Sequence, residues 1–487
     1  MVLMALRSRL LEQAQDAAER AVRLATELGA RYAEARLHRV QGQSFILRSG
    51  KVDPPELVDS YGLGVRVLVD GALAFGATNL LTQQSVAELV QGIVRRARAA
   101  SSLLKQPIEF SEERAHRAKW EAREQRRLAD LDEQEAMALL KGLDGIVLRA
   151  QDDVKLPYRL FVLGYSYEEK YYVNSEGASL SGRVPRLHFF SLVTALLGGL
   201  SAQRARQEGM SGGLELLREL ALENKVEEDV KALVKVLKEA QPSPTGELDV
   251  ILAPEVSGLT SHESVGHPLE ADRVLGREGA QAGESYLSRE DVGRQIGGQE
   301  AMVSDDPTLP NSYGFHLYDD EGVPARRRRL LVEGRVNELL HNRQSARAFG
   351  TKSNSAARAI AFDVEPIVRM ANTFIEPGDY GFEEMVREVE LGIYVKSFRE
   401  WNIDDKRLNQ RYVGLEAYLI EGGQLKHPVR DPVVEFTTPK YWSAIDARGK
   451  DLEFVAGSCG KGDPLQPLPV WIGGPHVRVR GVRVLRR

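Results

Sequence analysis

The chain opens with a helical pattern of apolar residues. Between residues 8 and 29 these residues recur at helical spacing, and Gly29 follows where a helix would end. Segments with the alternation of strands come next, at residues 33–40, 44–48, 64–69 and 72–77. Asp70 and Gly71 form a turn signal between the last two segments, which predicts a β-hairpin there.

Helix and strand patterns alternate through the rest of the first half. Residues 84–105 and 111–150 predict helices, residues 158–196 a strand-rich block and residues 214–240 a further helix. The Pro, Ser and Gly residues of 241–246 then mark the clearest domain boundary. We therefore expect residues 1–240 to form an N-terminal α/β domain in which helices cover a sheet.

The second half, residues 241–487, has a different pattern. Its short apolar runs are bounded by Gly, Pro, Asp and Asn, which is typical of strands. The predicted strands are 248–252, 314–318, 329–332, 336–340, 360–364, 392–398, 411–420 and 476–484. The predicted fold class is therefore α+β, with a β-rich C-terminal domain that also carries one helix near its start.

Composition narrows the class of protein. A length of 487 residues exceeds one ordinary core, and 43% hydrophobic with 28% charged residues is typical of globular proteins. The net charge of −5 gives no basic surface for nucleic acid, and the longest apolar stretch, 187–200, is too short for a bilayer. A single cysteine allows no internal disulfide, and the N-terminus lacks a signal-peptide pattern. We expect a cytoplasmic protein that binds neither nucleic acid nor membrane.

The candidate chemistry follows a strand that runs into Pro254, a residue suited to the first turn of a helix. That helix would carry His262 and Glu263, with His267 just beyond. Imidazoles bind a metal ion, and a neighbouring carboxylate can accept a proton from metal-bound water. This combination is typical of hydrolytic metal sites.

The spacing of the two histidines requires an irregular backbone. They are five residues apart, which is about 140° around an ideal α-helix, so a regular helix could not bring them to one ion. Gly266 relaxes the backbone, and Pro268 disfavours helical geometry at the residue before it. We predict that the helix ends or widens near Gly266 and turns His267 back towards His262.

The third ligand is predicted from the lone cysteine. A catalytic zinc site usually has three protein ligands, and Cys459 lies in a glycine-rich segment that can approach a metal closely. Glu270 and Asp272 are either partners that orient the histidines or exposed loop carboxylates. No oxyanion donor is visible, and five further histidines are interpreted as structural: His188, His316, His341, His427 and His476. Two alternatives stay open, a cysteine hydrolase that uses Cys459 and a non-catalytic regulatory or binding partner.

Several segments together resemble the TldD/PmbA family, also called modulators of DNA gyrase, and specifically its TldD-type zinc metallopeptidase subunit. The matching segments follow the family order through both halves of the chain: 62–79, 174–177, 262–272, 319–324, 416–423 and 457–462. One departure is Ala271, where the family usually has glycine, and the segment 273–279 after it also differs. These departures bear on substrate preference more than on catalysis.

The resemblance implies an active site and a partner. Zinc would be held by His262, His267 and Cys459, with Glu263 as the general base. The implied activity is cytoplasmic cleavage of unfolded or leader-like peptides bound as an extended strand. The implied assembly encloses a chamber and pairs the chain with a homologous PmbA/TldE-like subunit as a heterodimer, or with itself as a homodimer.

Overall fold

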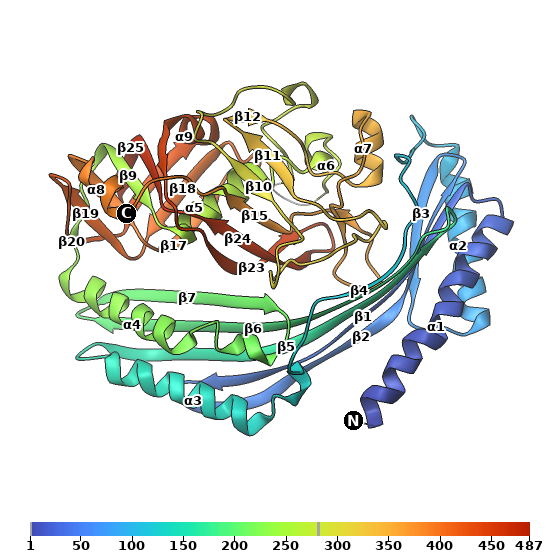
Figure 1. Cartoon of the computed structure of the whole chain (residues 1–487), viewed down its shortest axis with the longest axis horizontal. Coiled ribbons are helices and arrows are strands. Elements are labelled where there is room, and N and C mark those ends of the chain that lie inside the picture. Colours follow the sequence, from blue (N-terminus) through green and yellow to red (C-terminus); the bar gives the residue numbers. More distant parts are fainter. Residues whose placement is uncertain (1, 280–282) are drawn as a thin grey trace.

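The first half of the chain forms one long, curved sheet (Figure 1). The computed structural model describes the backbone of residues 2–279 and 283–487, with side chains from residue 14 onward. The strands are β1 (Tyr32–Arg48), β2 (Lys51–Val69), β3 (Ala72–Thr78), β4 (Arg117–Glu121), β5 (Lys155–Asn174), β6 (Ser179–Leu197) and β7 (Leu200–Ser211). Their order is β3-β2-β1-β5-β6-β4, with β7 also beside β6, and neighbours are antiparallel except β4 and β6.

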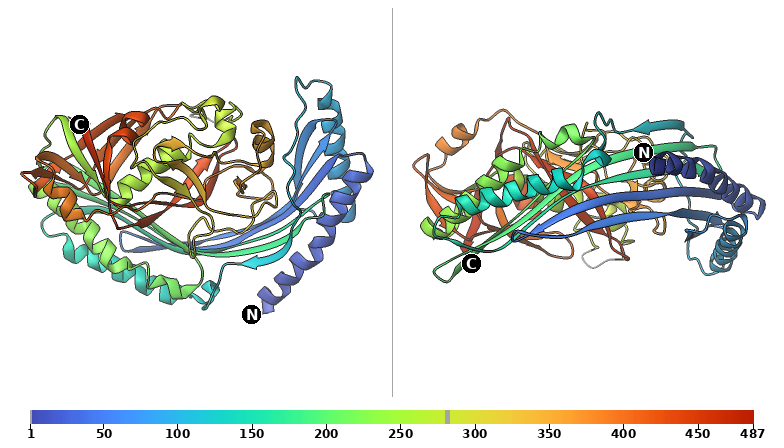
Figure 2. Two further views of the ribbon diagram at one scale, coloured as in Figure 1. Left: turned by 45° about the horizontal axis from the view of Figure 1, so that its top comes forward. Right: turned by 90° about the horizontal axis from the view of Figure 1, so that it is seen from below.

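Four helices cover the convex face of this sheet, and the second half of the chain lies on the concave face (Figures 1 and 2). The helices are α1 (Val2–Glu27), α2 (Gln83–Ser101), α3 (Glu133–Ala150) and α4 (Leu222–Glu239). Because successive side chains of a strand point to opposite faces of the sheet, one strand can contact both the helices and the second half of the chain. On β5, Tyr171 and Val173 pack in the core with the helices, whereas the Lys170 and Tyr172 side chains bind the second half. Among the described residues, no helix is both long and apolar enough to cross a membrane.

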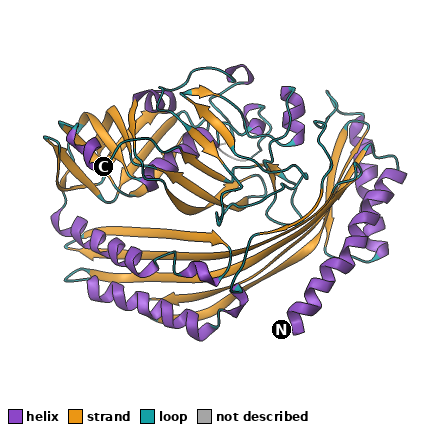
Figure 3. Ribbon diagram, viewed as in Figure 1, coloured by secondary structure: helices purple, strands orange, loops and turns teal. Residues whose placement is uncertain are grey.

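The second half is dominated by strands (Figure 3). A ten-stranded sheet has the order β17-β18-β21-β25-β9-β16-β19-β20-β8, with β22 beside β25, and a six-stranded sheet has the order β12-β11-β10-β15-β24-β23. The strands are β8 (Gln241–Pro242), β9 (Gly246–Leu252), β10 (Val303–Asp305), β11 (Arg328–Val332), β12 (Arg335–Val336), β13 (Ala357–Arg358), β14 (Ile367–Val368), β15 (Asn372–Ile375), β16 (Leu391–Val395), β17 (Phe398–Ile403), β18 (Asn409–Gly414), β19 (Ala417–Glu421), β20 (Gln424–Arg430), β21 (Pro432–Thr437), β22 (Ile445–Arg448), β23 (Glu453–Lys461), β24 (Gln466–Gly474) and β25 (Val477–Arg486). The helices are α5 (Pro254–Ser261), α6 (Ala271–Val274), α7 (Arg343–Phe349), α8 (Phe382–Arg387) and α9 (Thr438–Ala444). The predicted α+β class is confirmed, with a helix-covered sheet followed by a β-rich half.

Four local predictions were wrong, and one of them is the strand at 336–340, of which only Val336 lies in a strand. Residues 111–132 are not α-helical and contain only a short 3-10 turn at Leu128–Asp130. Strand β4 pairs with the edge of β6, and the α-helix begins only after Asp132, whose carboxylate accepts the N–H of Glu135. Residues 314–318 and 360–364 are not strands. The second of these segments instead packs on β2, where a Cβ on Gly62 would lie 2.3 Å from Phe362 Cδ2. The glycines of β2 therefore allow the two halves to approach closely.

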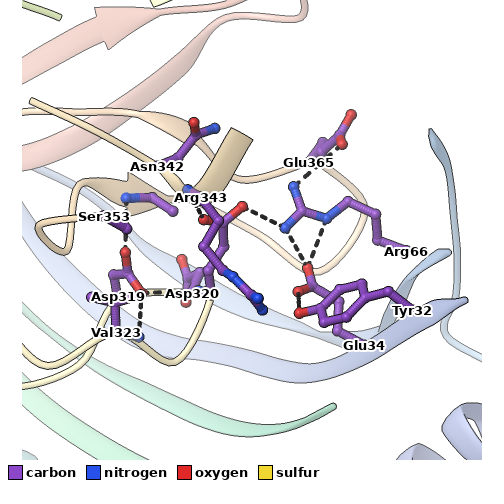
Figure 4. A network of polar contacts seen from close by, with 12 residues as sticks. Tyr32, Glu34, Arg66, Asp319, Asp320, Val323, Asn342, Arg343, Ser353 and Glu365 are labelled. Atoms are coloured by element: carbon purple, nitrogen blue, oxygen red, sulfur yellow. Dashed lines mark hydrogen bonds and ion pairs between the residues drawn. The ribbon is translucent and has the colours of Figure 1, made fainter. Parts of the chain in front are cut away.

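A buried network of charged side chains joins the halves (Figure 4). Glu321 accepts hydrogen bonds from the guanidinium of Arg66 on β2 and from the backbone N–H of Arg343, both at 2.6 Å. Arg66 also donates to Glu34 of β1 at 2.8 Å. The carboxylate of Asp319 accepts two backbone N–H groups of its own turn. The acidic segment 319–321 is thus part of a turn that docks the second half on the sheet.

Candidate metal centre

The helix that carries the candidate ligands lies flat on β24. One residue, Ala253, separates the end of β9 from the start of α5, and Pro254 occupies the first turn of that helix, as the sequence predicts. Close contact is possible because a Cβ on Gly258 would already lie 3.0 Å from the backbone of Gly473. The helix is buried over almost its whole length, so its C-terminal end is held firmly inside the second half.

The backbone widens where His262 begins. Residues His262–Gly266 form a π-helical turn, closed by a hydrogen bond from the N–H of His267 to the carbonyl of His262 at 3.1 Å. In this turn residue i+5 takes the place above residue i that i+4 has in an α-helix. The two imidazole rings lie 4.8 Å apart between centroids, at 83° to each other. The predicted widening near Gly266 is confirmed.

Gly266 allows the π turn because it has no side chain, and not only because its backbone is flexible. Its φ is not in the left-handed region, so its conformation is open to other residues. A Cβ there would lie 2.1 Å from Sδ of Met370, a buried core residue. A larger residue at this position would therefore force the turn or the Met370 side chain to move.

Strand β23 brings Cys459 to the two histidines. The Cys459 Sγ lies 3.5 Å from His267 Nε2, and one donor atom of each of the three residues lies within 4.8 Å of the others. All three residues are buried, and the Nδ1 of His262 has no hydrogen-bond partner among the described residues. A buried polar atom without a partner is costly, and imidazole nitrogen and thiolate sulfur are both donor types that bind zinc. The residues therefore fit a metal ion.

Charges around Cys459 favour its thiolate. Burial by itself raises the pKa of the thiol, but the neighbouring charges of His267 and Arg369 outweigh burial and lower the pKa to about 7. The Arg369 guanidinium also donates a hydrogen bond to the Cys459 carbonyl. A thiolate is the form that binds metal and the form that acts as a nucleophile.

Glu263 projects into the same cavity as the three candidate ligands. This cavity of about 690 Å³ lies between the halves, walled by β7 on one side and by α5, β17, β23 and β24 on the other. Burial raises the pKa of Glu263, but the positive charge of Arg407, together with those of His267 and His262, outweighs burial, so the pKa is lowered. Arg407 donates to the Glu263 carboxylate from the turn between β17 and β18. Nothing in the sequence around Arg407 indicates this contact.

Glu270 contacts a candidate ligand directly, whereas Asp272 does not. Glu270 Oε2 lies 2.9 Å from His267 Nδ1 and accepts a hydrogen bond from Arg273 at 2.7 Å. Lys461 donates to Asp272 at 2.7 and 2.8 Å and lies 3.3 Å from Glu270. Burial opposes ionisation of Glu270, but Lys461, His267 and Arg273 outweigh it and hold its pKa well below the usual value. Glu270 thus orients the ring of His267, whereas Asp272 forms an ion pair with Lys461.

The five other histidines noted in the sequence lie outside the cavity. Four of them have polar partners elsewhere: His188 with Ser44, His316 with two backbone carbonyls, His341 with Ser345, and His476 with Asp451 and Tyr394. His427 lies half-buried on β20. The histidines near the candidate centre are therefore His262 and His267.

Comparison with known families agrees with this geometry. Three models match the chain: PmbA/TldA metallopeptidase domain 1 over residues 33–102, the central domain over 126–238 and the C-terminal domain over 245–486. The chain is thus a metallopeptidase. It belongs to the PmbA/TldD family, which confirms the resemblance stated from the sequence.

Relatives of this family match almost end to end. A metalloprotease of Methanocaldococcus jannaschii is 28% identical over 450 residues, covering 92% of this chain and 95% of the relative. A zinc metalloprotease TldD homolog of Saccharolobus solfataricus is 25% identical over 467 residues, covering 95% of this chain and 98% of the relative. The crystal structure of TldE from Thermococcus kodakarensis has a TM-score of 0.72 at 18% identity, covering 96% of this chain and 99% of that one. The last likeness establishes a shared fold.

Proposed function

We propose that the chain is a zinc-dependent peptidase that hydrolyses unfolded or leader-like peptides, with zinc held by His262, His267 and Cys459. The observation that carries this proposal is the meeting of these three donors beside Glu263 in one cavity. Zinc is supported by the nitrogen and sulfur donor set, and by the name of the S. solfataricus relative.

Glu263 is the proposed general base. When bound, zinc would lower the pKa of a water to about 7 and polarise the peptide carbonyl. Glu263 is held ionised by Arg407, and its place next to His262 in the π turn puts a carboxylate beside the ligands. It takes a proton from the attacking water and passes that proton to the leaving amine.

The cavity suits a peptide in extended conformation. Three of its walls are edge strands from three different sheets: β7, β17 and β23. An edge strand offers backbone N–H and C=O groups that can pair with a further strand, which gives affinity with little dependence on sequence. This supports unfolded segments as substrates rather than folded proteins.

The two halves of the chain have different proposed roles, which divide at the domain boundary predicted from the sequence. Residues 1–240 form the shell and one wall of the substrate chamber, and residues 241–487 carry the catalytic groups. The fold shared with TldE supports a partner of PmbA/TldE type in a heterodimer, with a homodimer as the alternative. The proposed compartment is the cytoplasm, which agrees with the absence of a cysteine pair in the sequence.

A cysteine hydrolase is the second candidate, because one contact favours it. The Cys459 Sγ lies 3.5 Å from His267 Nε2, and the pKa of the thiol is lowered to about 7, as a nucleophilic cysteine requires. In this mechanism, however, neither Glu263 nor a second histidine has a necessary role. The two candidates therefore differ in what they require of Glu263.

Glu263→Gln tests the choice, with Glu247→Gln as the matched control because Glu247 is exposed on β9. The zinc peptidase predicts about one zinc per chain and loss of peptide hydrolysis in Glu263→Gln, with zinc content and the control variant unchanged. Chelation would stop hydrolysis, and zinc would restore it. Full hydrolysis by metal-free protein, abolished by thiol alkylation, would instead establish the cysteine hydrolase.

A further inference from the structure

The turn between β17 and β18 holds Arg407 beside the candidate metal centre. Arg407 has a φ of +61°, a left-handed conformation that is uncommon for a side chain of this size. The turn is held by the carboxylate of Asp404, which accepts the N–H groups of Leu408 and Asn409 at 2.8 and 3.1 Å. The hydroxyl of Thr438 donates to the Arg407 carbonyl at 2.8 Å. Backbone strain of this kind is often retained where a side chain has a functional position.

The guanidinium of Arg407 is buried and incompletely bonded. Its side chain is 11% exposed, its Nη1 donates to Glu263, and its buried Nε has no partner among the described residues. A guanidinium has five N–H donors, and a buried donor without an acceptor is unfavourable. The guanidinium also lines the cavity, so it lies where a bound substrate can accept a hydrogen bond from it.

The other arginines that line the cavity form ion pairs with carboxylates that do not contact the candidate metal ligands. Arg204 and Arg206 both bind Asp229, at 2.9 and 2.6 Å, and Arg399 faces an aspartate of the second half at 3.3 Å. Arg407 differs because the carboxylate that it binds among the described residues is the proposed base, Glu263. Its positive charge therefore lies beside the reacting groups.

Hydrolysis moves negative charge away from Glu263. As water attacks the peptide carbonyl, the new O–C bond forms, the carbonyl π pair moves to the oxygen, and the water proton passes to Glu263. Glu263 becomes neutral in the same step that makes the substrate oxygen anionic. A guanidinium held by the carboxylate before the step is then attracted to the oxygen, until the C–N bond breaks and the amine takes the proton.

We propose that Arg407 is the catalytic residue that stabilises the oxyanion, held by Glu263 in the free site and transferred to the substrate oxygen during attack. This inference rests on the proposed peptidase function and supplies the oxyanion donor that the sequence does not reveal. Hydrogen-bond donors to the developing oxyanion account for a large part of catalysis in acyl transfer.

The test compares a tetrahedral probe with a planar one. The probes are a phosphinic analogue of a cleaved test peptide, and the same peptide with its scissile amide N-methylated. Arg407→Gln is expected to lower the affinity for the phosphinic probe and the kcat by about 10²–10³-fold, as for loss of one oxyanion donor. KM, zinc content and affinity for the N-methylated probe are expected to change little, and Arg407→Lys is expected to recover part of the loss.

Lys406→Gln is the matched control, because it removes one charge from the same turn at an exposed position and leaves Arg407 in place. Equal weakening of both probes, unchanged phosphinic binding, or loss of zinc from the Arg407 variants would each overturn the inference. Failure of the peptidase proposal is distinct, because wild-type protein would then hold no zinc and cleave no peptide.

Discussion

Replacement of Gly266 by alanine tests the packing that shapes the π turn. The backbone conformation at Gly266 is open to alanine, so the effect comes from contact alone. The added Cβ would lie 2.1 Å from Met370 Sδ and 3.3 Å from its Cε. Favourable contacts between such atoms are about 3.5–4.0 Å, so the turn or Met370 must move by more than about 1 Å.

The magnitude follows from the burial of this contact. Met370 is 1% exposed and lies in the main core of the second half. Inserting a methyl group into such a core costs about 1–3 kcal/mol. Because the relieving shift moves the turn between His262 and His267, we also expect weaker zinc binding.

A double-mutant cycle measures this effect directly. Met370→Ala alone is expected to cost about 2–5 kcal/mol, but it removes the clashing atoms. Urea unfolding of the metal-free single and double variants should therefore show a favourable coupling of about 1–3 kcal/mol. Gly92→Ala in α2 is the control, since its Cβ meets nothing within 4 Å, and it should stabilise the protein by roughly 0.5–1 kcal/mol. Additive effects of Gly266→Ala and Met370→Ala would refute the packing argument.

Two further predictions concern the ring of His267 and the buried neutral histidines. Glu270→Gln should weaken zinc affinity by about 10- to 100-fold, because it removes the charge that fixes His267. Burial lowers the pKa of His316 to about 3 and that of His188 and His341 to about 4. As pH falls, these histidines take up protons in the unfolded chain before they do so in the folded protein. Their contribution to the free energy of unfolding is therefore retained above about pH 6.5 and is lost as pH drops towards their pKa values in the folded protein. At pH 5 each histidine should cost about 2 kcal/mol of stability.

Each of these two predictions is checked with one further variant. Zinc titration of Glu284→Gln, an exposed site, should match the wild type. His316→Gln should show a smaller loss of urea stability between pH 7 and pH 5 than the wild type. Wild-type affinity in Glu270→Gln, or the same pH dependence in His316→Gln, would contradict the assigned contacts.

The geometry of the candidate centre could be predicted because its signals are local. A five-residue spacing between His262 and His267 cannot serve one ion on a regular helix, and Gly266 and Pro268 lie where the helix can change. The structure contains the required π turn. The lone cysteine was a candidate by its chemistry, although only the pairing of β23 with β24 places Cys459 beside His267.

Contacts between distant segments could not be predicted in the same way. Residues 360–364 are apolar enough for a strand, but tertiary packing against Gly62 of β2 makes them a turn. Arg407 lies 144 residues from Glu263 in a polar turn, and no pattern in that turn indicates a buried ion pair. Glu321 follows two aspartates, and nothing in that segment indicates that it is buried against Arg66 of the first half. In each case the decisive partner belongs to another part of the chain.

Zinc X-ray absorption of the purified protein tests the central claim most directly. The account predicts one sulfur ligand at about 2.3 Å and nitrogen or oxygen ligands at about 2.0–2.1 Å. The sulfur shell should disappear in Cys459→Ser and remain in Glu263→Gln. A bound zinc without a sulfur ligand, or one whose sulfur shell persists in Cys459→Ser, would contradict the proposed centre.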